Sequence, residues 1–431
     1  MNRYFLSFLD LLRRARSVQL SVLDQVMFNS CNAITTILVA RGLGPHMFGE
    51  YIFIWGLVIS VVTLQWAFLI SPMTTIGPKQ DIETAHYYYG AVFLTQLLSS
   101  MALFIIVWLG LFWQSNPIYH QMALPMAAAS SLYSCQEFIR RYFYATGAIQ
   151  KVFITDILGS ASQVLLLIFF LWRHWFDVEL VLWIVAWTSL ASILWGVLNA
   201  GKLTVHHQHV KKTFKRNWNF GSWTILSTII VTLATQAEVI LIKLFLGAAA
   251  LGGIRVVTIL GNLFVPLLQG IQNILVPKAG SILEKSGESA LLHYLWRTGF
   301  VITLLSLTVL VPVCIFRSPL IALIYGKVYL SYANFVILQA ICCFINVIRT
   351  FSTWLYLQAL EQVKFIFILT TTTNVLYIGL LAVLIHYFQV QGAFMAYITN
   401  ASMLLIGSVL YVFYLFKTKR LFWECSAWVS R

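Results

Sequence analysis

The amino-acid sequence predicts an all-α membrane protein with about twelve transmembrane helices. Of its 431 residues, 60% are hydrophobic and 10% are charged, whereas charged residues make up about a quarter of a soluble domain. Apolar runs of roughly 20 residues, the length that crosses the hydrocarbon core of a bilayer, recur from one end to the other. They leave no stretch long enough for a separate soluble domain.

The apolar runs can be placed one by one along the chain. Short stretches with glycine, proline or charged residues separate them. In order, the predicted spans are residues 18–40, 48–70, 89–111, 118–138, 152–171, 180–198, 220–246, 253–276, 298–315, 333–358, 365–386 and 393–416.

Lysines and arginines set the predicted orientation. The formal net charge is +14, and most of the 28 basic residues fall in alternate loops. The positive-inside rule places such loops, and with them both termini, in the cytoplasm. Because orientation in a membrane explains the charge, nucleic acid is not expected as a partner.

The segments outside the spans are short. Residues 1–17 mix Phe and Leu with Arg and predict an interfacial amphipathic helix rather than a signal peptide. Residues 199–219 form a basic cytoplasmic linker, and residues 417–431 a basic cytoplasmic tail. The six cysteines are scattered without a CxxC pair, so neither a disulfide framework nor a metal site is expected.

A short pattern occurs twice. "LGPHMFGEY" follows the first span from Leu43, and "LGAAALGGI" follows the seventh from Leu246, an offset of 203 residues. Both fit L-G-x-x-x-[FL]-G and predict a helix–helix corner, with Gly44 in the left-handed conformation and Pro45 opening the next helix. A looser echo joins "YATGAIQKVFI" to "LQALEQVKFIF". The matching order predicts an internal duplication.

The duplication predicts two lobes of six helices each. An even number of spans per half means that both halves enter the membrane from the same side. The pseudo-two-fold axis then lies along the membrane normal, and a binding cavity is expected between the halves near mid-depth. The predicted N-lobe comprises residues 18–198 and the predicted C-lobe residues 220–416.

Four stretches carry a resemblance to a known family. They are "LVARGLGPHMFGEYIFIWGL", "EFIRRYFYATGAIQKVFI", "EVILIKLFLGAAALGGIRVV" and "LIYGKVYLSYANFVILQA". In this order they resemble the polysaccharide transporter branch of the MOP flippase superfamily, the Wzx-like flippases for lipid-linked oligosaccharides, related to MurJ and the MATE exporters. The motifs are specific to the branch and not to a substrate.

The resemblance implies a fold and a function. The fold is two six-helix bundles around a cavity that opens alternately to either side of the bacterial inner membrane. The function is translocation of an oligosaccharide linked to a polyprenyl diphosphate of the undecaprenyl type, for O-antigen, lipopolysaccharide or exopolysaccharide biosynthesis. Membrane lipids and a polysaccharide polymerase or other assembly proteins are the further partners implied.

Three cations within or beside the spans are the candidates for substrate binding. Lys243 and Arg255 flank the second copy of the corner, and Arg349 lies in the tenth span. Charged side chains in a membrane are costly and favour a wet cavity or a partner, and arginine suits diphosphate because its guanidinium grips phosphate oxygens in pairs. Snorkelling to the interface, for Lys243 and Arg255, and a structural pair, for Arg349, are the alternatives.

Carboxylates within the spans are few. Asp24 and Glu238 are the candidates for coupling to H⁺ or Na⁺, and Asp156 lies near the start of the fifth span. An internal salt bridge is the alternative, and Arg255 is a better partner for Glu238 than Lys243 because residues five apart on a helix do not face each other. No cofactor is expected.

Three basic residues bracket the loop between the fourth and fifth spans. Arg140, Arg141 and Lys151 are candidates for capturing anionic headgroups at the cytoplasmic face. Membrane orientation explains them equally well.

Two other classes of protein fit the sequence less well. A MATE-like exporter of cationic small molecules calls for an acidic cavity, whereas the charges in these spans lean basic. A glycosyltransferase or ligase acting on polyprenyl phosphates needs grouped carboxylates or a sizeable loop, and the chain has neither, so no catalytic residues are expected. "GVLNAGKLT", residues 196–204, nearly matches a phosphate-binding loop, but Leu203 replaces the required Ser or Thr.

Overall fold

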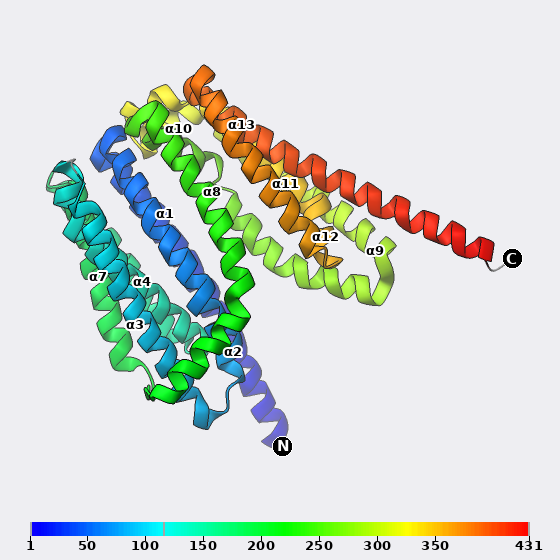
Figure 1. Ribbon diagram of the computed structural model, residues 1–431, viewed down its shortest axis with the longest axis horizontal. Helices are drawn as coiled ribbons and strands as arrows, with labels where there is room; N and C mark the ends of the chain where they lie inside the picture. The colour runs from blue at the N-terminus through cyan, green and yellow to red at the C-terminus, as the bar shows by residue number, and fades with distance from the viewer. Residues whose placement is uncertain (1, 115–116, 430–431) are drawn as a thin grey trace. The chain divides into compact units, whose positions relative to one another are not determined.

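The computed structural model describes residues 2–114 and 117–429, without the side chains of the first 18 residues, of residues 419–429 and of scattered positions between. Within these residues every regular element is a helix and none is a strand (Figure 1). The backbone of the predicted interfacial segment 1–17 is helical from residue 2 and continuous with the first span, while its side chains lie outside the described set.

Two compact units divide the chain, Met1–Thr232 and Leu233–Arg431. The N-terminal unit contains, in order, α1 (Asn2–Gln65), η1 (Trp66–Ile70), α2 (Ser71–Ile76), η2 (Gly77–Lys79), α3 (Ile82–Phe112), α4 (Pro117–Ala145), α5 (Ile149–Asp156), η3 (Ile157–Ala161), α6 (Ser162–Trp172) and α7 (Val178–Asn199). α8 (His207–Gly261) belongs to both units, which divide within it. The C-terminal unit continues with α9 (Val265–Ile315), α10 (Arg317–Ile324), η4 (Lys327–Tyr332), α11 (Phe335–Arg349), η5 (Thr350–Trp354), α12 (Leu355–Ala359) and α13 (Val363–Val429).

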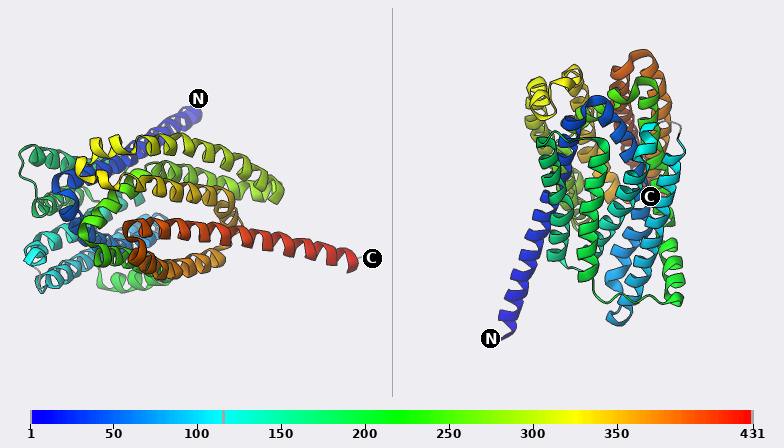
Figure 2. Two further views of the ribbon diagram at one scale, coloured as in Figure 1. Left: turned by 90° about the horizontal axis from the view of Figure 1, so that it is seen from above. Right: turned by 90° about the vertical axis from the view of Figure 1, so that its left-hand side faces the viewer.

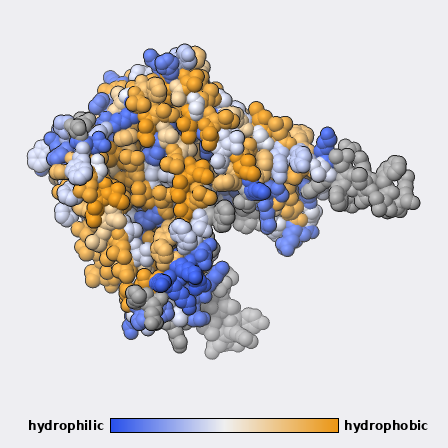
Figure 3. Space-filling model, in the orientation of Figure 1, coloured by the Kyte–Doolittle hydropathy of each residue, from blue (hydrophilic) through white to orange (hydrophobic). Residues whose placement is uncertain are grey.

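Each unit is a helical bundle. In the N-terminal unit α4 packs between α3 and α7, and α1 packs on α5 and α6 (Figures 1 and 2). In the C-terminal unit α11 packs on α9 and α13, and α12 packs on α9. Apolar side chains cover much of the visible surface of the molecule (Figure 3). Leu165, Leu198 and Leu244 are examples of exposed apolar residues. Such a surface is suited to lipid rather than to water.

The candidate membrane-spanning helices cover most of the predicted spans, but the fourth, residues 118–138, lies in α4, which is not among them. Eight stretches of the described residues are long and apolar enough to cross a membrane. Leu23–Lys79, of 57 residues, and Lys364–Thr418, of 55, are long enough to cross twice, since one crossing needs about 20 residues. Each is divided by a residue with non-helical backbone angles, Gly44 in the first and Gln389 in the second. The all-α membrane fold is therefore confirmed.

The repeated sequence pattern builds the same backbone break twice. Gly44 has φ 71° and ψ 173°, and Gly247 has φ 84° and ψ 171°. The positive φ is as predicted, but ψ lies far from the left-handed helical value, in a region that only glycine adopts without strain. Gly287 breaks α9 with nearly the same angles, φ 79° and ψ 179°. Glycine is required at these corners because it has no Cβ.

Several spans depart from regular α-helix. The eighth predicted span is broken, because α8 ends at Gly261 and α9 begins at Val265 after a three-residue turn. Three others contain one turn of π-helix, namely η1, η3 and η5. These begin directly after Gln65, Asp156 and Arg349, which places each irregularity next to a polar side chain. π-Bulges of this kind occur frequently at functional sites.

Each unit has its own apolar core. In the N-terminal unit, residues of η1 and α2 pack with Tyr89, Phe138 and Phe143 from α3 and α4. In the C-terminal unit, Leu268 and Leu295 of α9 pack with Phe351 of η5 and with Tyr356 of α12. These cores fix the helices on which the polar sites described below are built.

Replacing Gly44 with alanine is expected to destabilise the protein by about 1 to 3 kcal/mol, because a Cβ makes this backbone conformation strained. Gly110, in α3, supplies a matched control, since it is helical and a Cβ there would meet nothing within 4 Å. Gly110→Ala is expected to leave stability unchanged or slightly higher. Thermal unfolding of the purified variants in detergent compares the two, and equal melting temperatures would contradict the assignment of the corner.

Candidate functional site

A polar pocket of about 320 Å³ lies within the C-terminal unit. It is formed at the broken eighth span, where α8 ends and α9 begins, and is closed by α11. Five amide side chains, one threonine and one arginine supply its polar lining: Asn262, Gln269, Gln272, Gln339, Asn346, Thr350 and Arg349. No carboxylate lines it among the side chains that the structure describes. Broken helices that line cavities near mid-membrane are a common way to build transport sites.

Arg349 is the charged member of this pocket. It is the last residue of α11 and is followed by the π-helical turn η5. Its guanidinium carbon lies 4.5 Å from the centroid of the Trp354 ring. Its Nε is buried and has no hydrogen-bond partner among the described residues. A cation–π contact offsets only part of the cost of burying a charge, so this arginine favours an anionic ligand.

The amides of the pocket have unused hydrogen-bonding capacity. Gln339 Nε2 donates to Asn262 Oδ1 at 3.1 Å, and Asn346 Nδ2 donates to the Cys342 carbonyl at 3.1 Å. The buried Gln339 Oε1 has no partner within the described part of the chain. Amides both donate and accept, which suits sugar hydroxyls, while arginine suits phosphate.

Glu238 on α8 is held by two tyrosines of α13. Tyr377 Oη donates to Glu238 Oε2 at 2.9 Å, and Tyr397 Oη donates to Oε1 at 2.7 Å. Arg255 acts electrostatically on Glu238 and Tyr397, although the two charged groups form no ion pair within 4.0 Å among the described residues. Arg255 therefore influences Glu238 through space, without the salt bridge that was the alternative to ion coupling.

The three predicted substrate-binding cations do not share one pocket in the C-terminal unit. Arg349 lines the amide pocket, whereas Arg255 and Lys243 are absent from its lining. The Arg255 side chain is exposed, and Lys243 is half-buried on the turn before the Gly247 corner. Arg349 therefore lies with the amides, and Arg255 lies with Glu238 in a separate group of the C-terminal unit.

A buried ion cluster lies in the N-terminal unit. Arg140 of α4 pairs with Asp156 of α5 at 2.7 Å, from Nε to Oδ2, and with Asp24 of α1 at 3.4 Å, from Nη2 to Oδ2. All three side chains have 0% exposure. The Arg140 guanidinium carbon also lies 3.7 Å from the centroid of the Phe28 ring, and the Tyr144 hydroxyl donates to Asp24. Two carboxylates thus share one guanidinium.

This burial does not fit the headgroup-capture role predicted for Arg140. A cation that collects anionic lipid must reach the membrane surface, and Arg140 is enclosed by α1, α4 and α5 instead. Sequence alone could not distinguish it from its neighbour Arg141, whose side chain is 36% exposed and lies 3.9 Å from Glu137. Lys151 is also engaged, since its Nζ donates to the Asn199 carbonyl at 2.7 Å and so caps the end of α7.

Sequence reasoning missed several polar partners. Asp156 was recognised as a carboxylate within a span, but its pairing with Arg140 was not. Tyr377 and Tyr397 at Glu238 were also missed, as were the amides around Arg349. The available signal was the occurrence of Gln, Asn and Tyr inside apolar spans, because such groups need partners there. The sequence does not show which of these polar groups contact one another, because partners can be far apart along the chain, as Tyr397 and Glu238 are, at 159 residues.

Comparison with known proteins identifies the family. The family model described as "Polysaccharide biosynthesis protein" matches residues 15–282, more than half of the chain. The chain belongs to this polysaccharide biosynthesis protein family. No curated protein matches it at the level of sequence.

Solved structures show the same fold. An inward-facing multidrug resistance MATE family transporter of the MOP superfamily matches with a TM-score of 0.72 and 14% identity, over 92% of this chain and 96% of that one. The lipid II flippase MurJ, in an inward closed conformation, matches with a TM-score of 0.69 and 13% identity, over 91% and 87%. A MOP superfamily transporter from Pyrococcus furiosus matches with a TM-score of 0.59 and 15% identity, over 91% and 94%.

The family match and the shared fold agree with the resemblance drawn from the sequence. With eight stretches that are long and apolar enough to span a bilayer among its described residues, the chain is a multi-pass membrane protein, and its fold is that of MATE transporters and of the flippase MurJ.

Replacing Arg140 with alanine is expected to lower the free energy of unfolding of this protein by about 3 to 5 kcal/mol, because it leaves two buried carboxylates without their cation. Arg141→Ala removes the same charge from the adjacent, partly exposed position, where an ion pair contributes about 0 to 1 kcal/mol. Arg140→Lys, which keeps the charge but loses the paired contacts, is expected to fall between them. Thermal unfolding in detergent measures the order, and an Arg141 variant as unstable as the Arg140 variant would refute the cluster's structural role.

Proposed function

We propose that this protein is a flippase for polyprenyl-diphosphate-linked oligosaccharide in the bacterial inner membrane. It moves the headgroup from the cytoplasmic to the outer leaflet by alternating access, for the biosynthesis of O-antigen, lipopolysaccharide or exopolysaccharide. An undecaprenyl-type carrier is the proposed lipid. Membership of the polysaccharide biosynthesis protein family and the fold shared with a lipid II flippase support the class of substrate.

The amide pocket with Arg349 is the observation that carries the proposal. A diphosphate-linked sugar needs a cation for its phosphates and neutral donors and acceptors for its hydroxyls. Arg349 supplies the first, and the side chains of Asn262, Gln269 and Gln272 are among those that supply the second. Arginine holds phosphate through paired, charge-assisted hydrogen bonds. At about 320 Å³ the pocket accommodates the phosphates and the first sugars rather than a whole oligosaccharide.

Transport of this kind needs no covalent chemistry. The protein must bind the headgroup with different affinities in its inward-open and outward-open states. Arg255 and Lys243 remain proposed as further cations for the phosphates along the path, and the half-buried Arg141 and Lys151 for headgroup capture at the cytoplasmic face. Membrane lipids, and a polymerase or assembly protein that consumes the product, are the proposed partners.

Glu238 is the proposed site of ion coupling. Its carboxylate is enclosed by two tyrosine hydroxyls and lies under the influence of Arg255. A proton or a Na⁺ that binds there changes the electrostatic interactions of Glu238 with the two tyrosines and Arg255. Such a local change of charge shifts the equilibrium between two conformations. Asp24 is a second candidate, because two carboxylates share Arg140 and the cluster can accept a further positive charge. Both termini are proposed to be cytoplasmic, by the positive-inside rule.

Arg349→Ala is expected to slow flipping by about tenfold or more, the equivalent of losing one charge-assisted hydrogen bond. Arg349→Lys should keep part of the rate, since it retains charge but not paired bonding. Arg297→Ala removes an exposed arginine of α9 that does not line the pocket and serves as the control. The assay reconstitutes the full chain in liposomes with lipid-linked oligosaccharide and scores headgroup accessibility.

Two results of that assay would overturn the proposal. Equal rates for the wild type and Arg349→Ala would remove the pocket from the transport path. Transport of a cationic dye without lipid would assign the protein to the MATE-like exporters instead, which share the fold.

Glu238→Gln is expected to abolish the acceleration of flipping by a proton or sodium gradient, while flipping without a gradient continues. Glutamine keeps one oxygen that accepts from a tyrosine, and its amide N–H can donate to the other hydroxyl, but it does not ionise. Glu284→Gln, at an exposed position of α9, is the matched control. Flipping rates are measured in liposomes with and without each gradient, and a gradient effect that persists in Glu238→Gln would exclude this carboxylate as the coupling site.

A further inference from the structure

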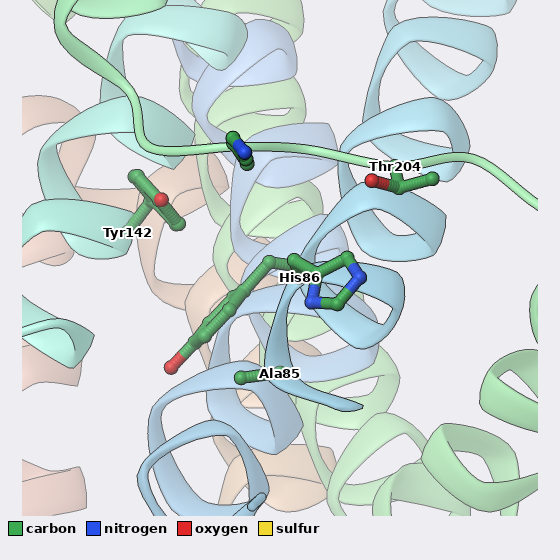
Figure 4. Close-up of a pocket in the computed structure, with 6 residues that line it drawn as sticks. Ala85, His86, Tyr142 and Thr204 are labelled. Atoms are coloured by element: carbon green, nitrogen blue, oxygen red, sulfur yellow. The ribbon is translucent and has the colours of Figure 1, made fainter. Parts of the chain in front are cut away.

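A second polar pocket, of about 610 Å³, lies within the N-terminal unit. It forms where the linker that follows α7 passes over the ends of α3 and α4 (Figure 4). Its lining is Ala85, His86 and Tyr89 of α3, Tyr142 of α4, and Lys202 and Thr204 of the linker. Figure 4 shows Thr204 above the imidazole of His86, with Tyr142 on the opposite side of the pocket.

The linker is held in place by specific contacts. The Thr204 backbone N–H donates to the His86 carbonyl at 3.2 Å. Gly90 allows the close approach, because a Cβ at that position would lie 2.4 Å from the Thr204 carbonyl oxygen. A Cβ on Gly201 would likewise touch the Tyr142 hydroxyl, at 3.8 Å. The pocket therefore has a defined wall although residues 200–206 form no helix.

Two aromatic rings form the opposite wall. Tyr89 and Tyr142 meet edge to face, with ring centroids 5.2 Å apart and an interplanar angle of 83°. Both are largely buried, and Tyr89 also packs over Gly77, where a Cβ would lie 2.4 Å from its hydroxyl. These rings are fixed by packing on both sides and present a preformed surface to a ligand.

The charge of the pocket is positive. Lys202 is exposed and forms no ion pair or hydrogen bond within the described part of the chain. Among the residues whose side chains the structure describes, the lining contains no carboxylate, and the neighbouring start of α8 carries further exposed cations, Lys211, Lys212, Lys215 and Arg216. A cation in a preformed pocket among other cations favours an anion.

We propose that this pocket binds the phosphate or diphosphate group of a phosphorylated ligand. Lys202 contributes the charge, and the Thr204 hydroxyl and the His86 imidazole contribute hydrogen bonds. The site is not a nucleotide-binding loop of the GxxxxGK[ST] kind, because Lys202 lies on an irregular linker after a membrane helix. A bound phosphate links the linker to α3 and thereby stabilises the linker's path. This site is in the other unit from the amide pocket, and it does not depend on the proposed transport function.

The test titrates sodium pyrophosphate into the purified full chain in detergent and measures the heat of binding. Lys202→Ala is expected to weaken binding by about tenfold, as for the loss of a charge-assisted hydrogen bond. Lys211→Ala removes the same charge from an exposed position outside the lining, and is expected to weaken binding less than about twofold, because exposed charges are screened. No binding, or equal losses in the two variants, would overturn the proposal.

Limited trypsin digestion supplies a readout on the unsubstituted protein. Pyrophosphate is expected to slow cleavage after Lys202 relative to cleavage after Lys211, as followed by mass spectrometry. In His86→Ala this selective protection should be lost. Protection that is equal at both lysines, or that persists in His86→Ala, would contradict the proposed contacts.

The source of the phosphate is distinguished by lipid composition. The same titration is run in nanodiscs of phosphatidylcholine with and without phosphatidic acid. Competition by phosphatidic acid that is lost in Lys202→Ala assigns the site to a lipid headgroup, whereas pyrophosphate binding unaffected by phosphatidic acid assigns it to a soluble phosphorylated ligand. Both outcomes support a phosphate site, and binding that is insensitive to Lys202 in either membrane contradicts it.

Discussion

The membrane-spanning part of this chain has to satisfy its backbone and charged groups internally, because the apolar region of a bilayer supplies no hydrogen bonds. Regular helix does so for most of the chain. Polar side chains lie next to the interruptions of the regular helix. π-Helical turns follow Gln65, Asp156 and Arg349, and the turn after Gly261 borders the pocket with five amides. The sites are therefore built at the positions where regular backbone hydrogen bonding is given up.

Each unit contains an arginine whose charge must be stabilised, and the two units do this in different ways. In the N-terminal unit, Arg140 is fully buried and is compensated by Asp24 and Asp156, so its charge is used within the fold. In the C-terminal unit, Arg349 lies against the Trp354 ring, and the described side chains of its pocket include no carboxylate. A compensated arginine stabilises structure, whereas one that lacks a carboxylate can take an anionic ligand. This difference is the physical basis for placing substrate recognition at Arg349 and stability at Arg140.

The sequence was sufficient for those features that depend on local composition. The apolar runs predicted the spans, and the repeated L-G-x-x-x-[FL]-G pattern predicted the corners at Gly44 and Gly247. It was insufficient where function depends on which helices meet. Arg140 and Arg141 are adjacent and identical in type, and only the packing of α4 against α1 and α5 makes one a buried ion-pair partner. The broken eighth span was not foreseen, since an asparagine in an apolar run does not reveal a turn.

The most direct test of the account is a structure of the full chain in nanodiscs with a bound polyprenyl-diphosphate-linked oligosaccharide. The account predicts phosphate oxygens within hydrogen-bond distance of the Arg349 guanidinium, and the first sugars against Asn262 and the glutamines of the pocket. A headgroup bound with its phosphates away from Arg349, and with the amide pocket filled only by water, would contradict it.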